Sequence, residues 1–174
     1  MSEFINLRYV TVEGWEAPVD TSHPDSPYCH VGQTKFGLRV KNSFINRIRW
    51  TANGIEHELK FINLVIAALD PASDLLVIIV GSKDLPKPNN AVVFNPDGTL
   101  NHQIIAPAFV EQTLEHMPNK DPVLQKYPVE FMDEVLVENG RILIGLCFRY
   151  EWIERRYYDP ATRQWQERDH IYRR

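Results

Sequence analysis

Two stretches of this chain repeat one outline of apolar strands and tight turns, and this repetition constrains the fold more than any other feature. Each stretch runs through an apolar strand, a tight turn, a second apolar strand, a loop, a strand, an Asx-Pro turn and a last strand. The two stretches cover about residues 55–105 and 131–172. Strands joined by tight turns pair antiparallel. The pattern therefore predicts a mainly β protein, a curved antiparallel meander sheet of two four-stranded, blade-like units plus N-terminal strands.

The turns between the strands carry specific residue pairs. Asn-Gly occurs at 53–54 and again at 139–140. This pair is the strongest short hairpin signal, because both residues readily adopt positive φ. Asn95-Pro96-Asp97-Gly98 suits a type I turn, and Asp159-Pro160 stands at the matching place in the second stretch. We expect a hairpin or tight turn at each of these places.

One apolar run predicts the centre of the sheet. Residues 75–80 are continuously apolar, which is typical of a strand buried on both faces. Pro86 and Pro88 exclude the following segment from a central strand, because proline lacks the amide donor. A propeller needs about four blades or more, and 174 residues leave too little room for that. We expect a single domain over 1–174, as one strongly curved sheet or two packed sheets.

Outside the two units the pattern changes. Alternation predicts strands at 6–12 and 34–42, and a cluster of Pro, Asp and Ser predicts a loop over 18–32. Between the units, Phe109, Leu114 and Met117 fall on one helical face. We therefore expect one short helix over about 107–117.

Composition places the chain among soluble globular proteins. Hydrophobic residues make up 44% and charged residues 24%. The longest apolar run is too short to cross a bilayer and no secretory signal is visible, so we expect a cytoplasmic protein without a membrane partner. The two cysteines, Cys29 and Cys147, are expected to be small buried hydrophobes, with a disulfide as the alternative.

No catalytic, cofactor-binding or metal-binding residue can be nominated from motifs. The six histidines lack the spacing of converging metal ligands. Gly-x-Ser-x-Gly is absent, and the eight glycines are scattered at turns rather than forming a phosphate loop. These absences leave the question of catalysis open but favour a protein that is not an enzyme.

The hairpin that closes the second unit has the composition of a binding surface. Trp, Tyr and Arg are enriched at interface hot spots, because each combines a large area with a polar end. The alternative is that its aromatic residues continue the core while Arg and Glu pair across strands. The residues we predict to bind a partner from this hairpin are Tyr150, Trp152, Arg155, Arg156, Tyr157 and Trp165.

Charge favours a protein partner over a nucleic acid. Residues 111–138 contain seven acidic residues and two lysines, an acidic segment that suits a basic partner. We therefore add Glu111 and Glu115 to the predicted partner-binding residues. The pI of about 5.9, and acidic residues such as Glu154 and Glu167 within the aromatic hairpin, argue against binding phosphates.

Three hypotheses of function follow. The leading one is a non-enzymatic protein that binds another protein, for example an immunity-type inhibitor of a basic toxin domain. The alternative is a β protein that binds a small molecule or carbohydrate, or hydrolyses it, in an aromatic-lined pocket closed by the 18–32 loop. An enclosed cavity with two or more His or carboxylate groups would favour the alternative. Self-association through an exposed edge strand, giving a homo-oligomer, is the third.

One short run resembles a known repeat. Arg156-Tyr157-Tyr158-Asp159-Pro160-Ala161-Thr162 is similar to the end of the Tyr-Asp repeat of Rhs-type proteins. The resemblance covers seven residues, and Arg163 stands where the repeat usually has glycine. We interpret it as the chemistry of an Asp-Pro turn flanked by aromatic residues.

Overall fold

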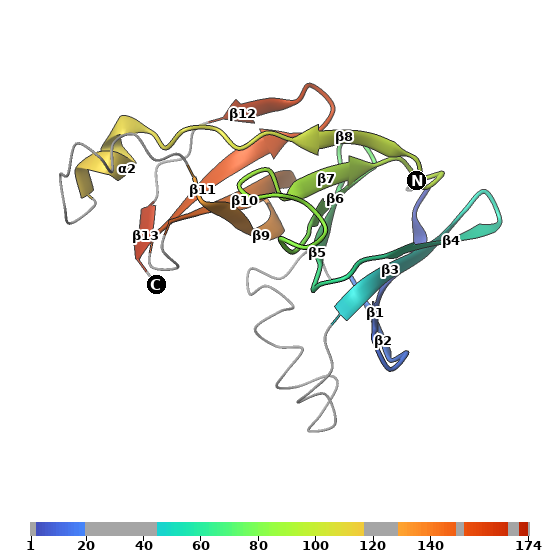
Figure 1. Cartoon of the computed structure of the whole chain (residues 1–174). Coiled ribbons are helices and arrows are strands. Elements are labelled where there is room, and N and C mark those ends of the chain that lie inside the picture. Colours follow the sequence, from blue (N-terminus) through green and yellow to red (C-terminus); the bar gives the residue numbers. More distant parts are fainter. Residues whose placement is uncertain (1–2, 20–44, 117–128, 149–151, 167–170, 174) are drawn as a thin grey trace.

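A computed structural model of the chain describes residues 3–19, 45–116, 129–148, 152–166 and 171–173. The strand predicted at 34–42, most of the loop predicted at 18–32, and Cys29 lie outside the described residues. The described part forms three antiparallel sheets, which confirms the mainly β prediction (Figure 1).

Each sheet is built from strands that are near neighbours in sequence. Sheet A has the order β2-β1-β3-β4 and contains β1 (Ile5–Thr11), β2 (Glu16–Pro18), β3 (Ile45–Ala52) and β4 (Ile55–Lys60). Sheet B is a meander of β5 (Ile66–Asp70), β6 (Leu75–Ile79), β7 (Ala91–Phe94) and β8 (Leu100–Ile104). Sheet C has the order β12-β11-β10-β9, with β13 also on β11, and contains β9 (Phe131–Glu138), β10 (Arg141–Phe148), β11 (Trp152–Asp159), β12 (Gln164–Gln166) and β13 (Ile171–Arg173).

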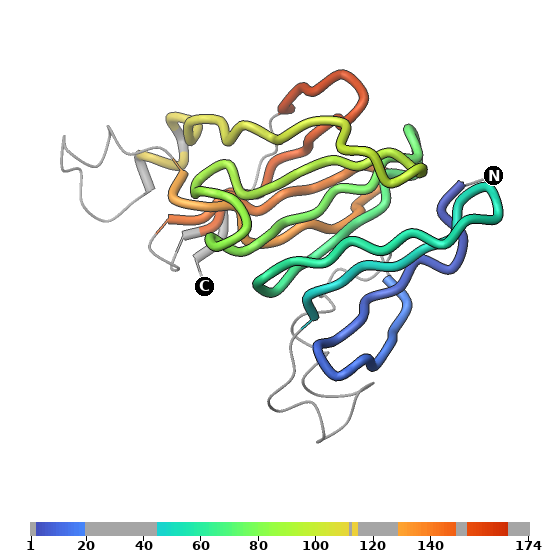
Figure 2. Tube along the Cα trace, turned by 45° about the vertical axis from the view of Figure 1, so that its right-hand side comes forward, coloured from blue at the N-terminus to red at the C-terminus, as the bar shows by residue number. Residues whose placement is uncertain are grey.

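Sheet B is the central layer, with an apolar core on each of its faces (Figure 2). Alternate residues of a strand point to opposite faces. Val77 and Ile79 of β6 therefore pack against sheet C, while Leu76 and Ile78 pack against sheet A. Every residue of β6 is buried, as the continuous apolar run predicted. The two units thus form two separate sheets packed face to face, and the N-terminal strands supply a third.

The first unit begins later than expected. The segment 55–60 is β4 and pairs with β3 in sheet A, so sheet B starts at β5. Between them the chain crosses from one sheet to the next. The carboxylate of Asp84 accepts hydrogen bonds from the amides of Ile62 (2.6 Å) and Asn63 (2.9 Å) in this crossing. The break between β4 and β5 is therefore fixed by a residue 21 positions from Asn63 in sequence, and the strand pattern, which runs on without interruption, does not reveal it.

The predicted turns are confirmed by their backbone geometry. Both residues of each Asn-Gly pair have positive φ, 51° and 77° at 53–54 and 52° and 72° at 139–140. The first pair joins β3 to β4 and the second joins β9 to β10. Gly98 closes the Asn-Pro turn with φ of 81° and donates its amide to the Asn95 carbonyl at 3.0 Å.

The short helix is α2 (Glu111–His116), which starts four residues later than predicted. The side chain of Phe109 lies in the core that sheets B and C share, and Leu114 packs against it. Glu154 of β11 accepts hydrogen bonds from the amide of Val110 (3.1 Å) and the hydroxyl of Thr113 (2.5 Å). A carboxylate beneath the first turn satisfies donors that a helix start leaves open. Glu154, which the sequence analysis counted among the acids opposing phosphate binding, is only 2% exposed.

Asn90 joins sheets B and C at the start of β7. This buried side chain donates to the carbonyls of Val80 (3.0 Å) and Met132 (2.9 Å). Its oxygen accepts from the amide of Met132 at 2.8 Å. The side-chain amide of Asn90 therefore forms the same pair of backbone hydrogen bonds with Met132 of β9 that a neighbouring strand would form.

We predict that Asn90→Ala lowers the free energy of unfolding by about 2–4 kcal/mol, because it leaves buried backbone groups of Val80 and Met132 without a partner. Urea denaturation measures the change. Gln103→Ala is the control. Because Gln103 is exposed, this substitution should lower the free energy of unfolding by about 0.5 kcal/mol or less. Equal costs for the two variants would contradict a bridging role for Asn90.

Candidate functional site

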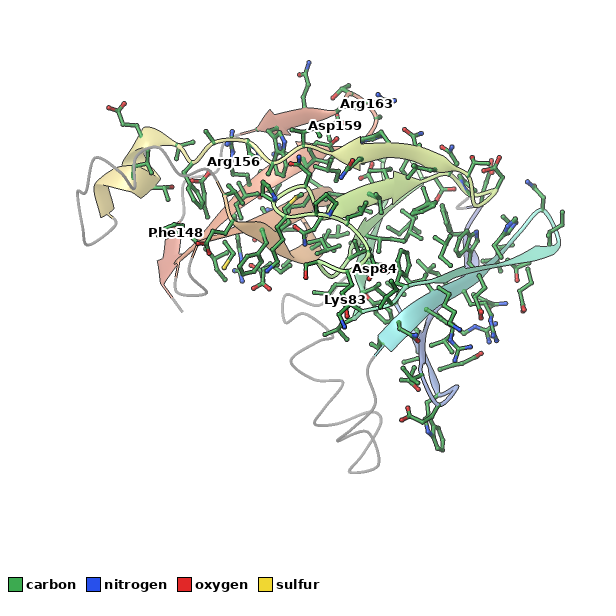
Figure 3. The ribbon with its side chains drawn as sticks, in the orientation of Figure 1. Lys83, Asp84, Phe148, Arg156, Asp159 and Arg163 are labelled. Atoms are coloured by element: carbon green, nitrogen blue, oxygen red, sulfur yellow. The ribbon has the colours of Figure 1, made fainter. Side chains whose placement is uncertain are left out.

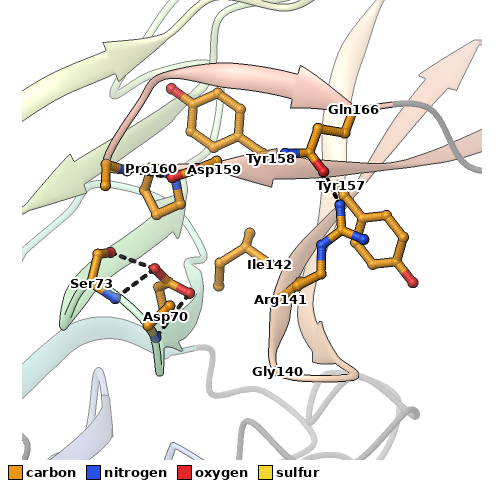
Figure 4. Close-up of a pocket in the computed structure, with 12 residues that line it drawn as sticks. Asp70, Ser73, Gly140, Arg141, Ile142, Tyr157, Tyr158, Asp159, Pro160 and Gln166 are labelled. Atoms are coloured by element: carbon orange, nitrogen blue, oxygen red, sulfur yellow. Dashed lines mark hydrogen bonds between the residues drawn. The ribbon is translucent and has the colours of Figure 1, made fainter.

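An open cleft lies between sheets B and C where three turns meet (Figure 4). The turns are β5–β6, β9–β10 and β11–β12, so both repeated units contribute to it. Its volume is about 220 Å³. The cleft is lined by Asp70, Ala72, Ser73, Gly140, Arg141, Ile142, Tyr157, Tyr158, Asp159, Pro160, Ala161 and Gln166.

Both carboxylates of the cleft hold their own Asp-Pro turns. Asp70 accepts hydrogen bonds from the amide of Ser73 at 3.0 Å and from its hydroxyl. Asp159 accepts from the amides of Ala161 (2.9 Å) and Thr162 (3.1 Å). Burial works to raise the pKa of Asp159, but a hydrogen bond from the Thr162 side chain, the two amide hydrogen bonds and the charge of Arg141 together lower it. Both turns therefore depend on an Asx-type contact of the residue before proline.

Arg141 forms the opposite wall. Its guanidinium carbon lies 3.8 Å from the centre of the Tyr157 ring, and the group donates a hydrogen bond to Gln166. Stacking on one side and a hydrogen bond on another fix the guanidinium while leaving it exposed. Between the walls lies Ile142, which forms an apolar floor (Figure 4).

The outer face of sheet C continues from Arg141 as a ladder of polar contacts. The hydroxyl of Tyr157 donates to Glu138 at 2.5 Å. One position further along the face, Arg155 forms a two-pronged ion pair with Glu134, one prong measuring 2.9 Å. Their side chains meet over Gly145, which pairs with both residues in the sheet register.

Gly145 is needed because of this close approach. A Cβ at position 145 would lie 2.5 Å from Cγ of Glu134. We predict that Gly145→Ala displaces Glu134 and costs about 1–3 kcal/mol in urea denaturation. In a Glu134→Ala background the same change should cost less, since the clash is gone. An equal cost in both backgrounds would show that the ion pair is not what requires glycine.

On the other side of β11, a hydrogen-bonded histidine joins sheets B and C. The Nε2 atom of His102 lies 2.7 Å from the Tyr158 hydroxyl, and its Nδ1 lies 2.7 Å from the side-chain oxygen of Asn101. Because that amide oxygen only accepts, Nδ1 carries the proton and Nε2 accepts from Tyr158. Burial raises the pKa of Tyr158 to about 12, so the hydroxyl keeps its proton.

The same chain of hydrogen bonds runs on through the β7–β8 turn. Asn101 donates to Asn95 (2.7 Å), Asn95 donates to Thr99 (2.9 Å), and the Thr99 hydroxyl donates to Asp97 (2.6 Å). The hydrogen bond from the Thr99 hydroxyl, and then the one from the Thr99 amide (2.9 Å), lower the pKa of Asp97. The carbonyl of Pro96 in this turn accepts from the indole of Trp50 in sheet A at 2.7 Å. The relay thus leads from sheet C across sheet B to sheet A.

Burial and the positive charge of Arg163 lower the pKa of His102. The unfolded chain then binds a proton at this position more readily than the folded one, so this contribution to stability is complete above about pH 6.5 and is lost as pH falls. We predict that the free energy of unfolding falls more steeply from pH 7 to 5 in the wild type than in His102→Gln. Parallel urea titrations test this, and identical pH profiles would contradict it.

The structure divides the predicted partner-binding residues between two surfaces. Arg155 and Tyr157 lie on the outer face of sheet C. Arg156 and Trp165 lie toward β8 instead, because Arg156 donates to the Ala108 carbonyl (3.1 Å) and Trp165 to the Ile105 carbonyl (3.0 Å). Figure 3 places Arg156 nearer to α2 than Asp159 and Arg163 are.

The remaining predicted residues are placed less completely. Glu111 is exposed in the first turn of α2. Tyr150 and the side chains of Trp152 and Glu115 lie outside what the structure describes. Cys147 is fully buried beside Phe131 and Ile153, as expected of a core thiol.

Sequence reasoning missed Arg141 and Gln166 as site residues. Arg141 follows an Asn-Gly turn and pairs in register with Glu138, which reads as an ordinary cross-strand charge pair. Its stacking on Tyr157 depends on the neighbouring strand β11. The sequence did offer one signal for Arg141, which directly follows a turn and precedes a strand rich in aromatic residues.

The described residues contain no group of three or more His, Cys, Asp or Glu side chains arranged to hold a metal ion. Within the same part of the chain, no helix is long and apolar enough to cross a membrane. The cleft can offer a fixed guanidinium, two turn-bound carboxylates and an apolar floor. These groups suit recognition of a charged ligand or side chain.

The described residues form a three-layered antiparallel β protein with an open cleft between sheets B and C. No protein-family model and no curated protein matches the sequence. A chain of the solved structure described as "Structure of Tne2 in complex with Tni2" has a similar fold, with a TM-score of 0.58 and 10% sequence identity. The match covers 98% of this chain and 99% of that chain. It therefore extends over all three sheets.

Proposed function

We propose that the protein acts by binding another protein rather than by catalysis, in the manner of an immunity-type inhibitor of a toxin. The observation that carries this proposal is the similarity, over nearly the whole chain, to a chain from a complex of two proteins. The use of Asp70 and Asp159 as turn-holding acceptors agrees with it.

The outer face of sheet C is the surface we assign to the partner. Arg155, Tyr157 and Arg141 are each held by a neighbouring side chain, so little side-chain entropy is lost when a partner docks. Arg and Tyr are also the residue types enriched at hot spots. The aromatic and arginine content of this hairpin therefore supports binding as well as folding.

The charge expected of the partner needs refinement. Glu134 and Glu138, two of the seven acids in the acidic segment, form contacts within sheet C. Glu111 and Glu130 remain exposed. A basic toxin domain stays our proposal for the partner, with α2 and the start of β9 as the acidic area. A cytoplasmic location likewise stays a prediction.

We predict that Arg155→Ala and Tyr157→Ala each weaken partner binding by at least about tenfold, because both remove hot-spot side chains. Isothermal titration against the purified product of a neighbouring toxin-like reading frame measures this. Arg8→Ala is the control, since Arg8 also forms an arginine–glutamate ion pair (2.9 Å, with Glu16), but a more exposed one on sheet A.

The control should bind within about twofold of the wild type, because Arg8 lies on sheet A, outside the surface assigned to the partner. Thermal melts of all three variants exclude loss of the fold. Binding that is equally weakened by Arg8→Ala would move the interface away from sheet C. No measurable heat with the wild type would contradict the function itself.

A further inference from the structure

The turn cleft carries opposite charges on its two sides. Asp70 and Asp159 stand on the side of the Asp-Pro turns, and Arg141 stands on the other, with Ile142 between them (Figure 4). Pro160 adds a second apolar surface. A cleft of this kind complements a ligand that is itself positive at one end, negative at the other and apolar between.

The guanidinium of Arg141 is prepared for an anion. Among the described residues, no carboxylate oxygen lies within 4.0 Å of the Arg141 guanidinium, the distance that defines an ion pair. Gln166 and Tyr157 hold the group but do not neutralise it. Arginine presents several donors in a planar fork that matches a carboxylate. Its position at an open cleft leaves part of that fork facing solvent.

The facing carboxylates are prepared for a cation. A carboxylate has about four lone-pair sites, and the hydrogen bonds from Ser73, Ala161 and Thr162 use only some of them. Those bonds also stabilise the ionised form. An ammonium group entering the cleft would therefore meet Asp159 directly, with the charge of Asp70, which is only 4% exposed, behind it.

We propose that this cleft binds a small zwitterion, a free amino acid or a dipeptide. The ligand's carboxylate would contact Arg141, its ammonium group would face Asp159 and Asp70, and its apolar side chain would lie against the exposed alanines of the lining, Ala72 and Ala161. The volume of about 220 Å³ is below the roughly 300–1,000 Å³ of sites for larger ligands. This inference does not depend on the protein partner proposed above.

NMR titration of the full chain with L-leucine and with glycyl-L-leucine tests the proposal. We expect saturable shifts of the Ser73, Gly140 and Ala161 amides below about 10 mM for at least one of the two. The better ligand tells whether the site takes a free amino acid or a dipeptide. Leucinamide lacks the carboxylate and N-acetyl-leucine lacks the ammonium group, so each should bind at least about tenfold more weakly.

Variants assign the two ends of the ligand. Arg141→Gln should weaken leucine or dipeptide binding at least about tenfold, since it removes a charge-assisted contact. Arg163→Gln is the matched control, because it removes an exposed arginine from the same region without touching the cleft lining. Asp159→Asn should weaken the binding of the zwitterion but leave the binding of N-acetyl-leucine unchanged. Asparagine can keep the turn through its side-chain oxygen.

Three results would overturn the proposal. The first is the absence of saturable shifts with both leucine and glycyl-leucine in the wild type. The second is equal binding of leucinamide or N-acetyl-leucine, because the two charges would then not be recognised together. The third is an equal effect of Arg163→Gln and Arg141→Gln. The ligand comparisons use the wild-type chain, so they remain decisive if a variant fails to fold.

Discussion

The fold depends on burying both faces of sheet B. Its central strand β6 has no exposed residue, so neither face is stable without a covering sheet. Sheet A covers one face through Trp50 and Ile48, and sheet C covers the other through Ile144 and Leu146. Each outer sheet can then present its second face as a charged or polar surface. The turns of sheets B and C meet at one end of these sheets, which is where the cleft forms.

Local chemistry was enough to predict most strands and turns. Asn-Gly and Asp-Pro pairs act through their own backbone geometry, so 53–54, 139–140 and 159–160 were readable from sequence. The boundary within 55–105 was not, because Asp84 sets it from a distant position. Alternation placed Arg155 and Arg156 on opposite faces, but nothing local revealed which face another sheet would cover. Ladder contacts such as that of Arg141 depend on register and escaped prediction for the same reason.

Many acidic side chains of the described region act within the fold. Asp70 and Asp159 hold turns, Asp84 holds a crossing, and Glu154 supports the start of α2. A net acidic charge is thus a poor guide to where a basic partner would dock. Exposed charged groups such as Arg141 and Glu111 therefore carry more functional information than the overall charge does.

The relay from Tyr158 to Asp97 has a further consequence. Every hydrogen bond along it points the same way, since each side chain donates to the next and the last acceptor is a carboxylate. Reversing one amide would leave two donors or two acceptors face to face. The whole series must therefore be kept or replaced together. Anyone redesigning the edge of sheet B should treat these positions as a single unit that joins sheets B and C.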